Sequence, residues 1–263
     1  MTDNRQQRLV VRVGRNSLSF STTNGSEVIY EPYPMNASIS VAANLREALR
    51  TVALLGAPYG QVLVMVDTPV LMVPALLFVE EEADTLYRHT FTVEEQTVVM
   101  HTVLPDLNAV ALFPVLKDLR GVITDHFRQV TFSAAVTPVW RHLYRRSFTG
   151  QRQKLYAYFH DQRMEVFAYA QGRFKFCNSF VAQNADDALF YLLSVWKQLA
   201  MAAEHDELFF VGDFAERDAL MERVQMFVKR VFLINPSGEF NRAAVTQIAG
   251  IPYDLITLYM KGR

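Results

Sequence analysis

The chain has 263 residues, 51% of them hydrophobic and 20% charged, which is enough apolar material for one large or two small cores. Its formal net charge of −1 excludes a general electrostatic attraction to nucleic acid or to an anionic membrane. Cys177 is the only cysteine, so a disulfide framework and a cysteine-based metal site are excluded as well.

Three strands are predicted at the start of the chain. Leu9–Val13 is short and apolar, and Leu18–Ser21 alternates apolar and polar side chains, as a half-buried strand does. Asn24-Gly25 is a strong signal for a tight turn, and it predicts that the next strand, Glu27–Tyr30, pairs back onto its predecessor.

A helix, a buried strand and an insertion follow. Leucine and alanine recur at helical spacing over Val41–Leu55, and the continuous apolar run Gln61–Val66 is typical of a strand buried on both faces. The next part of the chain adds a helix beginning at Glu80–Asp84, strands at Gln96–Leu104 and Val110–Phe113, a helix at Leu116–Asp125, a strand at Gln129–Ala134 and a helix at Trp140–Arg146.

The second half repeats the order of the first half with the same spacing between its strands. It is predicted to contain strands at Lys154–Phe159, Met164–Tyr169 and Arg173–Phe176, a helix from the N-cap Asn184 through Leu199, a strand at Glu207–Val211, a helix at Glu216–Val228, a strand at Arg230–Ile234 and a last helix at Pro252–Met260. We therefore predict a mixed α/β protein with two lobes, residues 1–150 and 151–263. Each lobe has a β-β-β-α-β core, and the first carries an insertion.

Several strings support a more specific assignment: Leu18-Ser19-Phe20-Ser21, Val73-Pro74-Ala75-Leu76-Leu77-Phe78, and Phe176-Cys177-Asn178-Ser179-Phe180, with Tyr191-Leu192-Leu193 in the helix that follows. In these strings the sequence is similar to a family of uncharacterised bacterial proteins. The repeated core resembles the duplicated ribonuclease-H-like lobes of the actin-like ATPase fold, to which that family is assigned. The resemblance implies two lobes that can close around a ligand in the cleft between them.

The residues that make this fold an enzyme are missing. Active members of the superfamily carry Asp-x-Gly after the first strand of each lobe, where turn amides hold phosphates and carboxylates organise Mg²⁺. Here Arg12 and Gly14 stand at those positions in the first lobe, and Tyr158 and His160 stand there in the second. Gly212 alone stands where the family has two adenosine-binding glycines. Because neither first strand contains Asp or Glu, a two-metal nuclease is excluded on the same ground.

We expect a non-catalytic scaffold or interaction module with an unidentified protein partner. The alternative is a nucleotide- or anion-binding switch with weak or no hydrolysis, whose interlobe cleft is lined by Gly14, Arg15, Asn16, Ser17, Asp161, Gln162, Gly212 and Asp213. Under the scaffold hypothesis we expect no catalytic residue, no metal site and no cofactor. Under the alternative hypothesis, ATP or ADP is the ligand. A sugar or acyl kinase would need an acid that the first strands lack.

The remaining signals favour plain structural roles. The basic helix Trp140–Arg146 is interpreted as a solvated face rather than a nucleic-acid site, and Cys177 as a small core residue. The histidines have no metal-ligand spacing. Asp67 and Asp213 follow equivalent strands in the two lobes and are interpreted as loop-capping residues. Arg15 and Arg163 lie near the two hairpin turns, and an anionic ligand is conceivable only if both side chains face the same cleft.

The predicted cellular setting follows from the ends and the apolar runs of the sequence. The polar segment Met1–Arg8 does not have the pattern of a signal peptide. The most apolar run, Val70–Val79, is interrupted by Pro74 and is shorter than the roughly 20 residues that a spanning helix needs. We therefore expect a cytoplasmic protein that neither inserts into a membrane nor binds nucleic acid.

Overall fold

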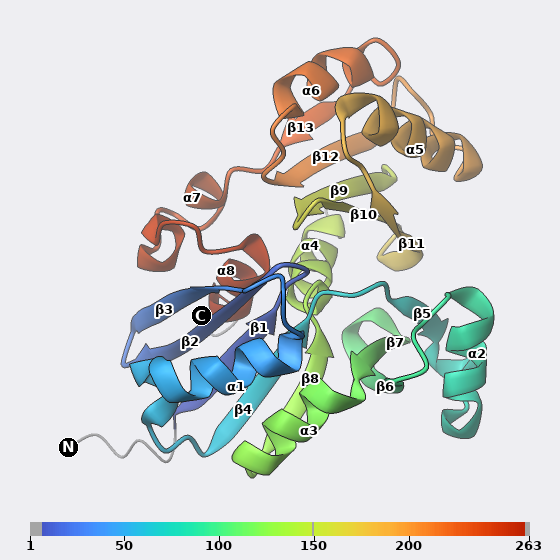
Figure 1. Ribbon diagram of the computed structural model, residues 1–263. Coiled ribbons are helices and arrows are strands. Elements are labelled where there is room, and N and C mark those ends of the chain that lie inside the picture. Colours follow the sequence, from blue (N-terminus) through green and yellow to red (C-terminus); the bar gives the residue numbers. More distant parts are fainter. Residues whose placement is uncertain (1–6, 149, 261–263) are drawn as a thin grey trace. The chain divides into compact units, whose positions relative to one another are not determined.

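The computed structural model describes residues 7–148 and 150–260, and the chain divides into two compact units, residues 1–137 and 138–263 (Figure 1). The predicted boundary lay later, between residues 150 and 151. The difference is helix α4 (Thr137–Ser147), which belongs to the second unit from Pro138 onward. The Tyr169 hydroxyl donates to the Trp140 carbonyl at 2.8 Å, and Lys154 Nζ donates to the Arg146 carbonyl at 2.9 Å. These bonds fix α4 against the sheet that follows it in sequence.

The first unit is built on a five-stranded sheet in the order β3-β2-β1-β4-β8. Its strands are β1 (Arg8–Val13), β2 (Ser17–Asn24), β3 (Glu27–Pro34), β4 (Gln61–Val66) and β8 (Val130–Ala134). The first three pair antiparallel, and β1, β4 and β8 run parallel. Helices α1 (Val41–Thr51) and α3 (Lys117–His126) lie together on one face of this sheet (Figure 1).

The insertion in the first unit forms a three-stranded antiparallel sheet in the order β5-β7-β6. Its strands are β5 (Leu71–Pro74), β6 (Thr97–Leu104) and β7 (Ala109–Leu116), and helix α2 (Ala83–Thr90) packs on it. Val73, Tyr87 and Leu112 are buried in a separate small core, and the Tyr87 hydroxyl donates to the Pro69 carbonyl at 2.7 Å. The insertion therefore has its own packing.

The second unit repeats the sheet of the first in the order β11-β10-β9-β12-β13, with the same strand directions. The strands are β9 (Lys154–His160), β10 (Arg163–Ala170), β11 (Arg173–Val181), β12 (Glu207–Gly212) and β13 (Val231–Leu233). One face packs on α5 (Ala185–Gln198) and α6 (Arg217–Gln225). The other face is aromatic, with the Tyr156 ring stacked between Phe167 and Phe209 at centroid distances of 5.4 and 5.0 Å.

Local sequence explains several of these boundaries. Asn184 caps α5 as predicted, because its side-chain oxygen accepts a hydrogen bond from the Asp187 amide at 2.9 Å. Asn235 and Pro236 start the short helix α7 (Pro236–Glu239), which was not predicted since four residues carry no periodicity. After α7 the chain continues to α8 (Tyr253–Tyr259), close to the predicted final helix.

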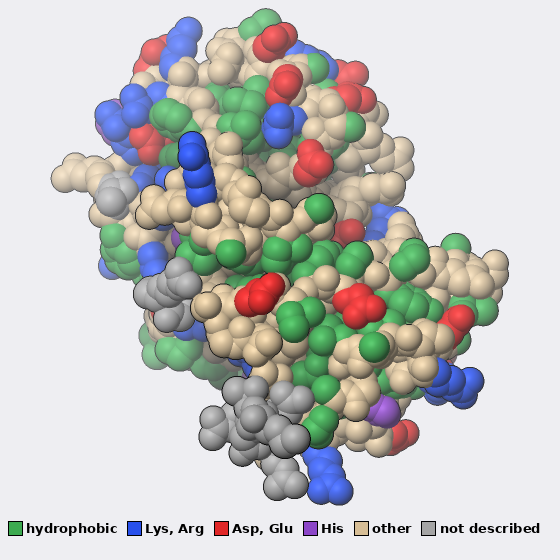
Figure 2. Space-filling view, turned by 90° about the vertical axis from the view of Figure 1, so that its left-hand side faces the viewer, with side chains coloured by type: hydrophobic (Ala, Val, Ile, Leu, Met, Phe, Trp, Pro, Cys, Tyr) green, Lys and Arg blue, Asp and Glu red, His purple; other side chains and the backbone are tan. Residues whose placement is uncertain are grey.

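Strand β3, at the edge of the first sheet, has features that disfavour pairing with a further strand. The loop between β2 and β3 has two residues, so the Asn24–Glu27 pair beside it is hydrogen-bonded and the bonded pairs alternate from there. This parity turns the backbone nitrogens of Pro32 and Pro34 outward, where proline has no hydrogen to donate. Hydrophobic and acidic side chains share the surface on the side where β3 lies (Figure 2). The proline half of β3 thus offers few donors to another strand.

Candidate functional site

The first-unit turn, whose residues Gly14–Ser17 would line the cleft under the alternative function, lies between β1 and β2. The Gly14 amide donates to the Ser17 carbonyl at 2.8 Å, and the Asp67 amide donates to the Val13 carbonyl at 2.8 Å. Gly14 is buried, whereas Arg15 and Asn16 are exposed and Ser17 is half-buried. The structure therefore places Asp67 and the Gly14–Ser17 turn at the same end of the first sheet.

The second-unit turn lies between β9 and β10. Asp161 and Gln162 both have positive φ, 44° and 62°, as expected for a tight two-residue hairpin. Gly212 pairs with Phe159 at the carboxyl end of β9, so Gly212 and the exposed Asp213 lie at the same edge of the sheet as this turn. The eight predicted residues thus form two groups of four, one in each unit.

Gly212 cannot be replaced by a residue with a side chain without rearrangement. Its φ is +85°, and a Cβ atom there would lie 2.1 Å from the Phe159 carbonyl oxygen and 3.1 Å from the Tyr158 ring. The glycine is required by close packing of β12 against β9 and by its left-handed backbone. Its presence therefore has a local structural reason that is independent of any nucleotide.

Tyr158 occupies the position of the second-lobe acid, and its side chain is fully used in packing. It is 1% exposed, its hydroxyl donates to Asp254 Oδ2 in α8 at 3.2 Å, and its ring stacks on His160 at a centroid distance of 4.4 Å. Asp254 is itself completely buried. The end of β9 is thereby joined to the carboxyl-terminal helix.

His160 stands at the predicted glycine position beside two carboxylates. Its Nε2 atom lies 3.9 Å from Glu165 Oε1, and its Nδ1 atom lies 3.9 Å from Asp161 Oδ2. Glu165 is a buried acid on β10 that the sequence analysis did not single out. A side chain with an imidazole therefore stands where the resemblance predicts a glycine.

Arg163 follows the same turn. Its Nε and Nη1 atoms are buried, and no acceptor among the described residues lies within hydrogen-bond distance of them. Buried donors without a protein acceptor are uncommon, and a water molecule or an anion often satisfies them. This is the feature of the second unit that most favours an anionic ligand.

These residues do not fit a magnesium nucleotide held in the manner of the superfamily. Arg12, 4% exposed, brings a cation to the first acid position, and Tyr158 brings a phenol to the second. A guanidinium repels Mg²⁺, and the Tyr158 hydroxyl is engaged with Asp254. The acid positions of β1 and β9 therefore offer no carboxylate, although Asp161 follows β9 in the turn.

A buried polar cluster that the sequence analysis missed fastens the carboxyl-terminal segment to α4. The carboxylate of Glu239 accepts hydrogen bonds from His142 Nε2 at 2.8 Å, from the Tyr253 hydroxyl at 2.7 Å and from Arg146. Burial alone would raise the pKa of Glu239, but these hydrogen bonds and the neighbouring positive charges lower it. Burial, and then the Glu239 charge, raise the pKa of Tyr253. No sequence motif predicts this cluster, because His142 and Arg146 are far from Glu239 in the sequence.

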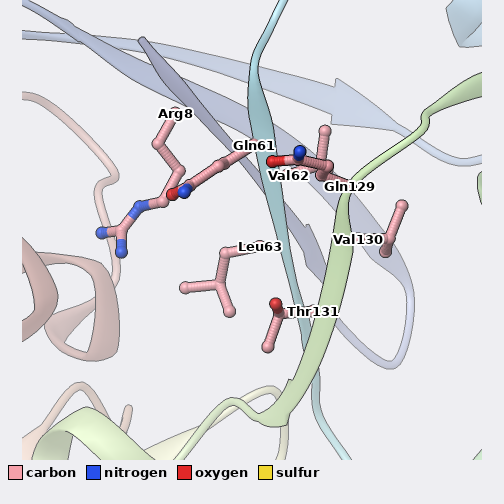
Figure 3. Close-up of a pocket in the computed structure, with 7 residues that line it drawn as sticks. All are labelled: Arg8, Gln61, Val62, Leu63, Gln129, Val130 and Thr131. Carbon is pink, nitrogen blue, oxygen red and sulfur yellow. The ribbon is translucent and has the colours of Figure 1, made fainter. Parts of the chain in front are cut away.

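A pocket of about 290 Å³ lies at the other end of the first sheet, at the amino ends of β1, β4 and β8 (Figure 3). Arg8, Gln61, Leu63 and Thr131 line it, together with Val62, Gln129 and Val130. Ligands of open α/β sheets bind at the carboxyl ends of the strands, and ligand pockets are commonly larger than this one. We therefore do not place the functional site here.

Cys177 and the basic helix α4, which were also considered as functional features, have structural roles in this fold. Cys177 is half-buried in β11 rather than fully in the core. Helix α4 buries Trp140 and Leu143 and exposes Arg145, so it is a packed helix with one basic face.

Among the described residues, no helix has the length and the apolar character needed to cross a bilayer.

Comparison with known proteins agrees with this architecture. A Bacteroides thetaiotaomicron protein with an actin-like ATPase fold and unknown function is 27% identical over 94% of this chain and 99% of its own, with a TM-score of 0.84. The PilM-PilN type IV pilus biogenesis complex gives a TM-score of 0.57 at 11% identity, over 97% of each chain. No curated protein matches the sequence.

The family profile described as "Protein of unknown function (DUF3822)" matches residues 1–231. This match spans both five-stranded sheets and ends at the start of β13, before α7 and α8. The similarity to the Bacteroides protein independently supports the fold. The chain therefore belongs to the DUF3822 family of proteins of unknown function, and it has the actin-like ATPase fold.

Proposed function

We propose that this protein is a cytoplasmic, non-catalytic scaffold or interaction module that retains the actin-like ATPase fold without its nucleotide chemistry. The observation that carries the proposal is the state of Tyr158, which replaces the expected acid and donates its hydroxyl to the buried Asp254. A carboxylate that organises Mg²⁺ must be accessible to the ion, and this side chain is neither acidic nor accessible.

A protein partner is favoured over a small-molecule substrate. PilM, which shares the fold, was solved in a complex with PilN. At 11% identity this resemblance concerns the fold, so it supports the idea that such a scaffold can work by assembly and names no partner for this chain.

Thermal unfolding of the purified full chain tests the proposal. Ligand that binds the native state at roughly 100 times its Kd adds about 2.7 kcal/mol of stability. With millimolar Mg-ATP, Mg-ADP, or ATP in EDTA, we expect the melting temperature to stay that of the protein alone. A magnesium-dependent rise of several degrees would overturn the proposal.

The alternative function is an anion- or nucleotide-binding switch without efficient hydrolysis. The buried Nε and Nη1 atoms of Arg163, which have no acceptor among the described residues, favour it. Under this alternative, inorganic pyrophosphate or ATP in EDTA raises the melting temperature of the wild type, and Arg163→Gln abolishes the rise. Arg15 is an exposed arginine in the turn between β1 and β2. The variant Arg15→Gln therefore serves as the control, and it should keep the rise in melting temperature if the anion binds beside Arg163. If neither anion shifts the melting temperature, the alternative is wrong.

A further inference from the structure

Strand β11 is the outer strand of the second sheet, and it lacks the prolines that protect the equivalent strand β3. In the sheet order, β10 is the one described strand bonded to it (Figure 1). Its nine residues contain no proline. The register to β10 shifts at Lys175, which leaves Phe176–Val181 as a regular stretch. A regular edge strand of this kind is a template for pairing with another strand.

The register shows which backbone groups of β11 point away from β10. The hairpin between β9 and β10 has two residues, so the His160–Arg163 pair beside it is hydrogen-bonded and the Arg163 backbone faces β9. The partner of Arg163 in β11 is Val181, whose backbone therefore points outward. By alternation the Ser179 backbone points outward as well, and its amide donates to the side-chain oxygen of Asn178 at 2.9 Å.

Apolar side chains flank this edge. The Phe180 ring stacks on Tyr191 of α5 at a centroid distance of 4.5 Å, and Phe190, 67% exposed, lies against the Tyr191 ring at 5.5 Å. Val181 follows on the opposite face of the strand and is 47% exposed. Peptides that add a strand to a sheet gain affinity from main-chain hydrogen bonds and specificity from side-chain contacts of this kind.

The amino-terminal half of the edge is basic. Arg173 and Lys175 are exposed, and neither side chain is hydrogen-bonded or ion-paired with another described residue. Residues 171–183 contain no Asp or Glu. The next acid in the sequence, Asp186, lies beyond the other end of the strand and is paired with Arg223. Electrostatic complementarity therefore favours a partner with acids beside Arg173 and Lys175.

We propose that β11 binds an extended segment of a partner protein as a sixth, antiparallel strand, with acidic residues at the carboxyl-terminal end of the segment. Antiparallel pairing is slightly the more stable, and it places that end beside Arg173 and Lys175. A second copy of β11 fits less well, because it would bring two more cations to the edge and no acid. The inference rests on the proposed function, which calls for a protein partner, and it gives the binding segment a chemistry.

Fluorescence anisotropy with a labelled synthetic peptide, acetyl-Thr-Val-Thr-Val-Thr-Glu-Thr-Glu, tests the proposal on the purified full chain. A short segment gives a small interface, so we expect a dissociation constant in the micromolar range or weaker. Raising ionic strength from about 0.05 M to 0.5 M should weaken binding several-fold. One control peptide has lysine in place of glutamate, and a second has proline in place of valine and cannot form the ladder. Both should bind at least about tenfold more weakly.

A charge reversal tests the basic end. Arg173→Glu with Lys175→Glu should lower the affinity for the glutamate peptide at least about tenfold and raise the affinity for the lysine peptide. The matched control is Lys229→Glu, an exposed position just before β13 at the opposite edge of the sheet, which should bind as wild type.

A proline tests the backbone edge. Ser179→Pro removes an outward donor and no bond to β10, as Pro32 and Pro34 do in β3, so the variant should fold and lose the glutamate peptide. Circular dichroism melts check the folding of every variant, and the charge reversal remains decisive if Ser179→Pro does not fold.

Four results would overturn the proposal. They are no binding of the glutamate peptide at millimolar concentration, equal binding of the control peptides, an unchanged affinity in the charge reversal or in folded Ser179→Pro, and wild-type dimers that Ser179→Pro abolishes, which would make a second copy the occupant. The melting test with Mg-ATP uses no peptide, so a failure here is distinguishable from a failure of the proposed function.

Discussion

Tyr158 shows how one residue changes what the end of a strand can do. Its phenol takes the place of an acid, stacks on His160 and donates to Asp254 in α8. The residue type was visible in the sequence, and so was the loss of the acid. Its partner was not, because Asp254 lies 96 positions away and no local pattern specifies a contact of that range.

Gly212→Ala should destabilise the protein by at least about 2 kcal/mol. The methyl group would meet the Phe159 carbonyl oxygen at 2.1 Å, and φ of +85° is strained for alanine. The matched control is Gly121→Ala in α3, where a Cβ atom meets nothing within 4 Å, and where helix propensity predicts a gain of about 0.5–1 kcal/mol. Urea unfolding measures both; equal effects of the two substitutions would refute the packing role of Gly212.

Glu239→Gln should lower the free energy of unfolding by about 2 kcal/mol at pH 7, because Arg146, His142 and Tyr253 lose the carboxylate that they face. The folded-state pKa of Glu239 lies below its ordinary value of 4.5. Its contribution is therefore present above pH 4.5 and is lost as the pH falls through the lowered pKa. Denaturant unfolding at a series of pH values should show the two proteins converging in acid.

The control for that experiment is the exposed Glu204→Gln, which should match the wild type at every pH. A constant difference between wild type and Glu239→Gln from pH 7 to pH 3 would contradict the assignment, since an uncharged role of the side chain would not titrate.

At the scale of elements, the sequence specified those with a local signal. Alternation in Leu18–Ser21 and the Asn24-Gly25 turn predict β2 and the hairpin to β3, and both are present. Strand β5 was missed because Val70–Val79 is apolar without alternation, and the Arg173–Phe176 prediction stops short of β11, which continues to Val181. Helix α1 ends at Thr51, and a 3₁₀ turn (Ala53–Gly56) takes up the rest of the predicted helix.

The N-cap of α5 makes a quantitative prediction at this scale. Asn184→Ala removes the acceptor for the Asp187 amide and should cost about 1 kcal/mol. Asn184→Asp keeps an oxygen in the same place and should cost much less. Thermal or urea unfolding of the two variants provides the comparison, and an equal loss for both would mean that the cap contributes through some other contact.

At the scale of the molecule, the two five-stranded sheets with one strand order account for the repeat seen in the sequence. Helix α4 groups with the second unit because its buried Trp140 contacts the second sheet, a contact that composition does not reveal. The eight predicted site residues fall at strand ends in both units, and their placement follows from the β-β-β-α-β order. Arg163 was named from the sequence, but the burial of its donor atoms and the Glu239 cluster are visible only in the packed structure.

The central claim, that the fold is kept without nucleotide chemistry, is tested most directly by measuring phosphate release from Mg-ATP by the purified full chain. Enzymes of ordinary efficiency turn over at roughly 1–10³ s⁻¹. We predict release no faster than from Mg-ATP alone, with no change on adding EDTA. Turnover of about 1 s⁻¹ or more that EDTA abolishes would contradict the account.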